Sequence, residues 1–130
     1  MIILGIDPGI QKLGWAVIKK EKNKMELISC GLISTKSGES KLERFKKIKA
    51  ELIKLIKLYQ PQVLALEKIL FFKNKKTALE IAQIIGVLIS LAGDYQMKLY
   101  EFIPTQIKLA VTGYGRADKL SMKKMINMFF

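Results

Sequence analysis

Two short apolar segments of this sequence each end in a carboxylate. Residues 2–6 contain only hydrophobic residues and glycine and lead into Asp7, and residues 63–66 are hydrophobic and lead into Glu67. Continuous apolar runs of this length are typical of strands buried in a parallel sheet. If the two strands run parallel, both carboxylates leave the sheet at its carboxyl edge, where open α/β sheets place their sites. This pattern predicts a site built from both segments.

The remaining segments predict a mixed α/β fold. A capping-box sequence at Ser40 and Glu43 begins a helix that ends at Tyr59, ahead of Pro61. A second capping box, formed by Thr77 and Glu80, is expected to begin the next helix. We expect one domain over 1–130, with a sheet of about five strands whose first three are antiparallel, flanked by helices. The expected elements are strands at 2–7, 13–19 and 25–34, a helix at 40–59, a strand at 63–67, a helix at 77–92, a strand at 98–103, and helices at 104–111 and from 118 onward.

The charge of the chain is strongly positive. Lysine and arginine number 23 against 11 acidic residues, which gives a net charge of +12. Such an excess is typical of nucleic-acid binding, because neutralised phosphates release counterions. The alternative is that the lysines serve solubility, since only Arg44 and Arg116 are arginines. The single cysteine, Cys30, and the absence of histidine exclude an internal disulfide and the usual zinc site, and we expect a cytoplasmic protein.

The pairing of Asp7 with Glu67 indicates a metal site. Two carboxylates at close range repel each other unless one keeps a proton or a cation bridges them. Mg²⁺ prefers oxygen ligands and commonly retains water and substrate phosphate, so it is the expected cofactor, with Mn²⁺ as a substitute. Taken singly, Asp7 can instead be a turn residue before proline, and Glu67 can be half of a surface ion pair.

The helix expected at 77–92 is apolar on nearly every side. A small domain buries one side of such a helix, so the other side indicates a homodimer. The alternative is a helix sandwiched inside the monomer. Its apolar stretch, at 77–93, falls below the roughly 20 residues of a bilayer span, so we expect no membrane contact. The residues expected at the dimer interface are Leu79, Ala82, Gln83, Gly86, Val87 and Ser90.

Several segments, in order, resemble the RuvC family of Holliday junction resolvases. They are residues 3–9 (ILGIDPG) with 14–18 (GWAVI), residues 60–67 (QPQVLALE), 72–74 (FKN) with 77–80 (TALE), and 106–108 (QIK) with 113–119 (GYGRADK). The resemblance runs over almost the whole chain, and the ordered set is specific where any one segment is weak. It implies a ribonuclease-H-like fold and a homodimeric, Mg²⁺-dependent endonuclease. Such an enzyme nicks two symmetry-related strands of a four-way junction in DNA recombination and repair.

The resemblance also assigns roles to residues. It implies that Asp7 and Glu67 are catalytic and bind the metal, and that Gly9 allows DNA to approach closely. Leu70, Phe71 and Phe72 are implied in the loop that probes the junction centre, although the two phenylalanines can instead cap the core. The cations expected to contact DNA phosphates are Lys73, Lys75, Lys76, Lys108, Arg116 and Lys119.

One part of the family pattern has no counterpart here. Relatives carry two further acidic ligands on a helix that would follow Phe130, and Asp94 and Asp118 are not placed to replace them. We therefore expect this chain to bind junctions and to cut them weakly or not at all. The alternatives are a non-cleaving branched-DNA-binding domain and a fragment of an actin-like nucleotide-binding fold. The resemblance also implies a bacterial source and a branch-migration motor complex as a partner.

Overall fold

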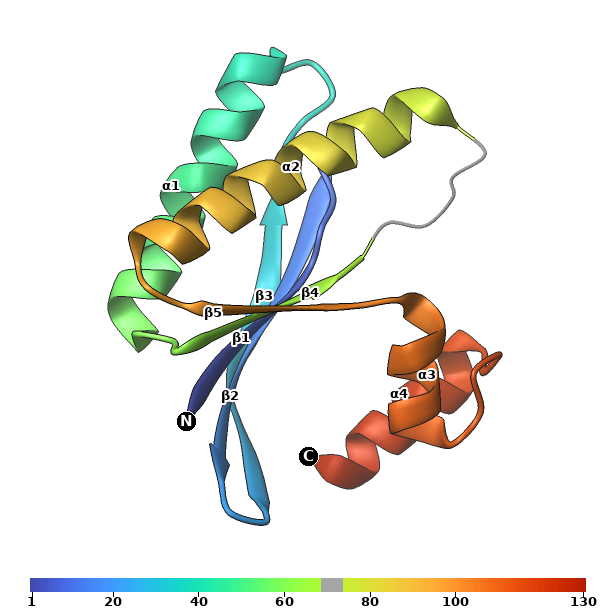
Figure 1. Cartoon of the computed structure of the whole chain (residues 1–130). Coiled ribbons are helices and arrows are strands. Elements are labelled where there is room, and N and C mark those ends of the chain that lie inside the picture. Colours follow the sequence, from blue (N-terminus) through green and yellow to red (C-terminus); the bar gives the residue numbers. More distant parts are fainter. Residues whose placement is uncertain (69–73) are drawn as a thin grey trace.

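The computed structural model describes residues 1–68 and 74–130, which form one five-stranded sheet and four helices (Figure 1). The sheet order is β3-β2-β1-β4-β5, in which β1, β2 and β3 pair antiparallel and β1, β4 and β5 run parallel. This confirms the predicted mixed sheet. The strands are β1 (Ile2–Asp7), β2 (Lys12–Glu21), β3 (Lys24–Ser34), β4 (Val63–Glu67) and β5 (Lys98–Phe102), and the helices are α1 (Lys41–Tyr59), α2 (Lys75–Asp94), α3 (Pro104–Thr112) and α4 (Lys119–Phe129).

The hydrophobic core lies between the sheet and the helices α1 and α2. Successive residues of a strand point to opposite faces, and the alternating burial along β1 and β4 follows this rule. α3 and α4 follow β5 and lie to one side of the sheet, away from this core (Figure 1). The sheet contributes Leu4, Ile6, Leu13, Val17, Ile33, Leu64 and Leu66 to the core, and the two helices contribute Ile48, Leu52, Ile56, Ile84, Leu88, Leu91 and Ala92.

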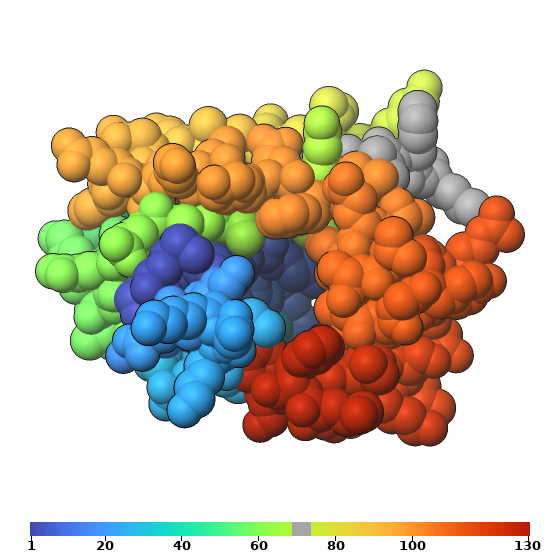
Figure 2. Space-filling model, turned by 60° about the horizontal axis from the view of Figure 1, so that its bottom comes forward, coloured from blue at the N-terminus to red at the C-terminus, as the bar shows by residue number. Residues whose placement is uncertain are grey.

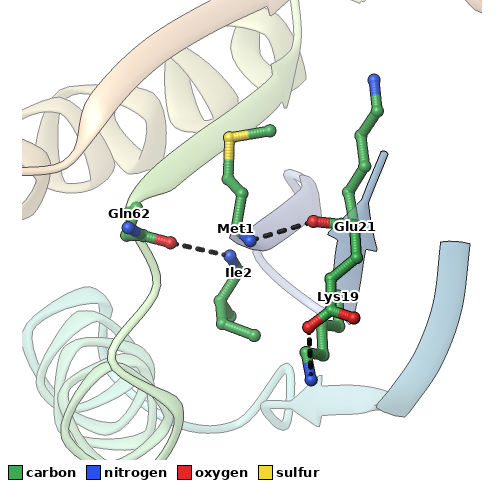
Figure 3. A network of polar contacts seen from close by, with 6 residues as sticks. Met1, Ile2, Lys19, Glu21 and Gln62 are labelled. Carbon is green, nitrogen blue, oxygen red and sulfur yellow. Dashed lines mark hydrogen bonds and ion pairs between the residues drawn. The ribbon is translucent and has the colours of Figure 1, made fainter. Parts of the chain in front are cut away.

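The amino end of β1 is fixed to both neighbouring strands (Figure 3). The amino group of Met1 donates a hydrogen bond to the Lys20 carbonyl at 2.9 Å. The backbone N–H of Ile2 donates to Oε1 of Gln62 at 3.0 Å, and the N–H of Gln62 donates to the Ile2 carbonyl at 2.9 Å. Because Gln62 immediately precedes β4, these bonds set where β1 and β4 begin relative to each other, and so where they end.

The N-cap of α1 is the residue predicted from the sequence, whereas the N-cap of α2 is not. The Ser40 hydroxyl accepts a hydrogen bond from the Glu43 N–H at 3.2 Å, which confirms the predicted cap of α1. The prediction that Thr77 caps α2 was wrong. The helix begins two residues earlier, because Oδ1 of Asn74 accepts from the N–H groups of Lys76 and Thr77. Asparagine is as good an N-cap as threonine or better, so the earlier residue takes the role.

The length of α2 also corrects the argument against a membrane span. At 20 residues, α2 is the one helix among those described that is long and apolar enough to cross a bilayer by length and composition. The same test is passed by core helices of soluble proteins. The buried side of α2, formed by Ile84, Leu88, Leu91 and Ala92, packs in the core described above. The other side of α2 faces away from this core.

Candidate functional site

Asp7 and Glu67 lie side by side at the carboxyl edge of the sheet. The parallel register pairs Gly5 with Ala65 and Ile6 with Leu66, so the two acids are the next residues on adjacent strands. Ile6 and Leu66 are buried in the core. By alternation, both carboxylates therefore point to the opposite face of the sheet, which α1 and α2 do not cover. The juxtaposition predicted from the two apolar runs is confirmed.

The surroundings of Glu67, Asp7 among them, change its ionisation. The Asp7 carboxyl lies within hydrogen-bonding reach of the Glu67 carboxyl. Partial burial raises the pKa of Glu67 to about 7, and the hydrogen bond and negative charge of Asp7 contribute to the rise. The positive charge of Lys108 opposes it. Near neutral pH the pair therefore carries a charge that a bound cation would stabilise.

The sheet face beside the two acids is lined by small residues. Gly5 and Gly14 flank Asp7 on β1 and β2, and Ala65 precedes Glu67 on β4. Together with Phe102 and Ile126 they line a cavity of about 560 Å³. A Cβ atom on Gly14 would lie 3.6 Å from the Cβ of Asp7, so a larger side chain there would fill space next to the carboxylate. This floor leaves room for a substrate backbone to approach.

The structure explains why position 9 is occupied by glycine. A Cβ atom at this position would lie 2.3 Å from the carbonyl oxygen of Lys12, a distance that real Cβ atoms do not adopt. The tight connection between β1 and β2 therefore requires glycine. Its predicted contact with DNA stays a prediction.

Lysines surround the acid pair. A second cavity, of about 750 Å³, is lined by Asp7, Glu67 and residues of α3 and α4. Its lining includes Lys108, Lys119 and Lys123. Figure 2 shows a hollow on this side of the molecule, between the β2–β3 hairpin, α3 and α4. The N-terminal strand forms the floor of this hollow. Acidic oxygens at the centre and ammonium groups around them form a site suited to a cation-bridged phosphate.

The acid pair fits a hard divalent cation by its donor chemistry. Two carboxylates on adjacent strands offer oxygen ligands, and the raised pKa of Glu67 reflects in part the charge of Asp7. Within residues 1–68 and 74–130, no third His, Cys, Asp or Glu joins them in a metal-binding group. Asp118 lines the same cavity, but its Oδ1 accepts a hydrogen bond from the Ser121 N–H at 2.7 Å and caps α4. That bond holds the pKa of Asp118 below its usual value.

Comparison with known proteins identifies the family. Residues 3–130 match the model of the family described as crossover junction endodeoxyribonuclease RuvC. The chain belongs to the RuvC family. A RuvC of Halothermothrix orenii is 41 % identical over 126 residues, which are 97 % of this chain and 76 % of the relative. A RuvC of Alkaliphilus metalliredigens is 42 % identical over 128 residues, which are 98 % of this chain and 78 % of the relative.

Solved structures agree with the RuvC assignment. Thermus thermophilus RuvC in complex with a Holliday junction substrate matches all of this chain and 79 % of its own, with a TM-score of 0.93 and 27 % identity. The fowlpox virus resolvase in complex with Holliday junction DNA matches 99 % of this chain and 73 % of its own, with a TM-score of 0.61. At 21 % identity, the viral enzyme shows a shared fold alone. The predicted ribonuclease-H-like fold is confirmed.

The structure separates the other predicted DNA-contacting residues into groups. Lys108 and Lys119 lie with the acids, whereas Arg116 lines a neighbouring cavity of about 430 Å³ with Tyr114 and Lys124. Lys75 and Lys76 are exposed in the first turn of α2. Leu70, Phe71, Phe72 and Lys73 lie outside the described residues.

Two cavity residues were missed by the sequence analysis. Lys123 and Asn127 of α4 line the cavity that holds the acids. With Lys119 they recur at intervals of four residues, which places them on one side of a helix. That spacing was a usable signal. Apolar residues of α4 are no better guide to its packing, since Leu120 and Phe129 are exposed.

The predicted dimer residues lie on the side of α2 that faces away from the core. Leu79, Ala82, Gln83, Gly86 and Ser90 are exposed, and Val87 is partly buried. Apart from the neighbouring backbone of α2 itself, no atom of the described residues lies within 4 Å of the position that a Cβ atom would take on Gly86. The monomer therefore leaves this side of an apolar helix uncovered among the described residues.

The raised pKa of Glu67 predicts a pH-dependent stability without metal. Between about pH 4.5 and 7 the folded state keeps a proton that the unfolded state releases, so wild-type stability falls as pH rises through this window. Glu67→Gln removes the effect. At pH 8 in EDTA the variant should be more stable by about 1 kcal/mol, a value reduced from the full shift because the site is open to solvent. At pH 4 the two proteins should be equal.

Urea unfolding at both pH values measures this difference. Glu51→Gln on α1 removes a partly exposed carboxylate paired with Lys54 and is the control; because it keeps Glu67, it should keep the pH dependence of wild type. Equal stabilities of wild type and Glu67→Gln at pH 8 would contradict the raised pKa of Glu67.

Proposed function

We propose that this protein is a structure-selective endonuclease that binds four-way DNA junctions as a homodimer and nicks two symmetry-related strands. Its role would be in DNA recombination and repair in the bacterial cytoplasm, with a branch-migration motor as a partner. The observation that carries the proposal is the carboxylate pair of Asp7 and Glu67 inside a lysine-lined cavity. Membership in the RuvC family supports the substrate, because its relatives are named as crossover junction endonucleases.

The residues of the site would have different roles in binding and cleavage. Asp7 and Glu67 would hold Mg²⁺, or Mn²⁺ in its place, through their carboxylate oxygens. When bound, such an ion activates water and stabilises the leaving oxygen in phosphodiester hydrolysis. Lys108 lies close enough to lower the pKa of Glu67, so it favours the ionised form that binds a cation. Lys119 and Lys123 would hold the phosphates on either side of the scissile one.

The exposed side of α2 supports a homodimer. An apolar helix surface left open to water is unfavourable, and a second copy of the same helix buries both surfaces at once. Gly86 and Ala82 allow two helix backbones to approach closely. A dimer also provides two active sites, as the cutting of two strands requires.

A second candidate function follows from the small number of acidic ligands. Within the described residues the acid pair has no third acidic partner, and this favours a domain that binds junctions without cutting them. The two candidates share the fold, the dimer and the DNA contacts. Cleavage in the presence of Mg²⁺ or Mn²⁺ separates them. The actin-like alternative loses its basis with the family assignment.

Neutralising the acids should separate binding from cleavage. Asp7→Asn and Glu67→Gln should bind a four-way junction as tightly as wild type or better, because they remove repulsion from phosphate, and should abolish any cleavage. Gel-shift titration in EDTA and gel analysis of strand nicking measure the two properties. Glu51→Gln is the matched control and should change neither. Cleavage that persists in both variants would remove these carboxylates from the mechanism.

Junction binding should depend strongly on salt. If the dimer contacts about six phosphates, the logarithm of the binding constant should fall with the logarithm of salt concentration at a slope near −5. Lys123→Ala should make this slope shallower by about 1 to 2, because each protomer loses one contact. Lys46→Ala, on the exposed surface of α1, should leave it unchanged. A wild-type slope near zero would mean that the lysines serve solubility.

A charge on the exposed side of α2 should break the dimer. Gly86→Glu adds a side chain where nothing lies within 4 Å, so the monomer should fold. Light scattering after gel filtration should give a dimer mass for wild type and a monomer mass for Gly86→Glu. Lys49→Glu, exposed on α1, should remain dimeric. A monomeric wild type would contradict the proposed interface.

A further inference from the structure

The loop that follows Asp7 is held in place by a single buried threonine. Thr35, just beyond the end of β3, is 8 % exposed. Its N–H donates to the Gln11 carbonyl at 2.9 Å, and its hydroxyl is hydrogen-bonded to the Ile10 carbonyl. Residues 8–11 form the connection from β1 to β2. Two successive carbonyls of a four-residue loop are therefore bonded to one residue from a different part of the chain.

Arg44 extends this contact into a series of hydrogen bonds, in which the Thr35 hydroxyl accepts from Arg44 and donates to the Ile10 carbonyl. Its Nε lies 2.9 Å from Oγ1 of Thr35. A guanidinium can only donate, so the threonine oxygen must be the acceptor in this bond. The hydroxyl proton is directed to the Ile10 carbonyl. Hydrogen bonds in such a chain polarise one another, and the charge at its start strengthens the bond to the loop. We call this series of hydrogen bonds, which runs from Arg44 through Thr35 to the Ile10 carbonyl, the loop relay.

The contacts that Arg44 makes do not indicate a role in stabilising the fold. Within residues 1–68 and 74–130, its Nη2 atom is buried without a hydrogen-bond partner. Its side chain takes part in neither of the ion pairs found there, which join Lys19 with Glu21 and Lys54 with Glu51. A buried donor without a partner is unfavourable. The structure retains a charged group whose observed bond is directed at the loop.

The loop relay reaches the site through the backbone. Thr35 and Arg44 are not among the described residues that line the two cavities containing Asp7. The loop is otherwise fixed by the buried side chain of Ile10 and by the close approach of Gly9 to the Lys12 carbonyl. Asp7 is the last residue of β1 and is joined directly to this loop.

We propose that Thr35 and Arg44 are positioning residues, which hold the 8–11 loop so that the Asp7 carboxylate faces Glu67 and the scissile phosphate. This inference rests on the proposed function for its link to cleavage, but the effect on the carboxylate pair can be measured without cleavage. Neither Thr35 nor Arg44 is among the described residues that line the cavities containing Asp7. Loss of the loop relay should therefore impair metal binding and catalysis while leaving junction affinity intact.

The test compares Thr35→Val with Thr35→Ser in the full chain. Valine keeps the shape and removes the hydroxyl, whereas serine restores the hydroxyl. Mn²⁺ affinity is measured by electron paramagnetic resonance of the free ion, with Asp7→Asn defining the loss of the site. Thr35→Val should weaken Mn²⁺ binding at least fivefold and slow single-turnover cleavage at least tenfold. Its junction affinity in EDTA should stay within twofold of wild type. Thr35→Ser should remain within threefold of wild type in every measurement.

Ser40→Ala is the stability control. It removes the N-cap of α1 and destabilises the helix that carries Arg44 without touching the loop. It should lower the melting temperature and leave Mn²⁺ affinity within twofold. Should Thr35→Val fail to fold, Arg44→Met takes its place, because methionine fills the space of the stem and removes the donor; a threefold or greater loss of Mn²⁺ affinity is then expected.

Two results would overturn the positioning role. One is Mn²⁺ affinity within twofold of wild type in Thr35→Val, or in Arg44→Met if that variant replaces it. The other is that Thr35→Val and Ser40→Ala lose Mn²⁺ affinity in proportion to their melting temperatures, which would make the role purely structural. A wild-type chain that cuts no junction overturns the proposed cleavage instead. The positioning role would survive that outcome if Mn²⁺ affinity still responded to Thr35.

Discussion

The pairing of β1 with β4 brings two like charges together, and the rest of the site depends on it. The register that pairs Ile6 with Leu66 places Asp7 beside Glu67, where partial burial and the charge of Asp7 disfavour the ionised form of Glu67. The energy that holds them there comes from elsewhere: the side chains that alternate with them are buried under α1 and α2. The fold thus uses its core to maintain an arrangement that is unfavourable without a cation. Such stored repulsion is typical of sites that bind metal ions.

The charges of the site are ordered from the centre outward. The acids stand at the sheet edge, Lys108 lies near enough to affect Glu67, and Lys119 and Lys123 lie along α4. In the proposed function, a net charge of +12 would attract DNA from a distance, while the central acids would repel a phosphate unless a cation is bound. One surface can thereby combine tight binding with a requirement for metal.

The supports of Asp7 come from three parts of the chain. Gln62 anchors the amino end of β1, β2 and β4 hold its length, and Thr35 holds the loop beyond it. Arg44 links that loop to α1, the helix that also covers the core. A disturbance of α1 at Arg44 would therefore reach Asp7 through the backbone, without any contact between α1 and the substrate.

The sequence by itself determined the elements and the acid pair, and tertiary structure decided what surrounds them. Apolar runs ending at Asp7 and Glu67 predicted parallel strands and a shared edge, because a helical crossover between two strands of one sheet leaves few other arrangements. The N-cap of α2 at Asn74 was missed because two candidate caps, Asn74 and Thr77, lie within one helical turn and local pattern does not rank them. The place of Lys123 beside the acids and the bonds of Thr35 and Arg44 to the loop depend on segments that meet only after folding. No local periodicity encodes such a meeting, because it is set by how helices and strand ends pack around the core.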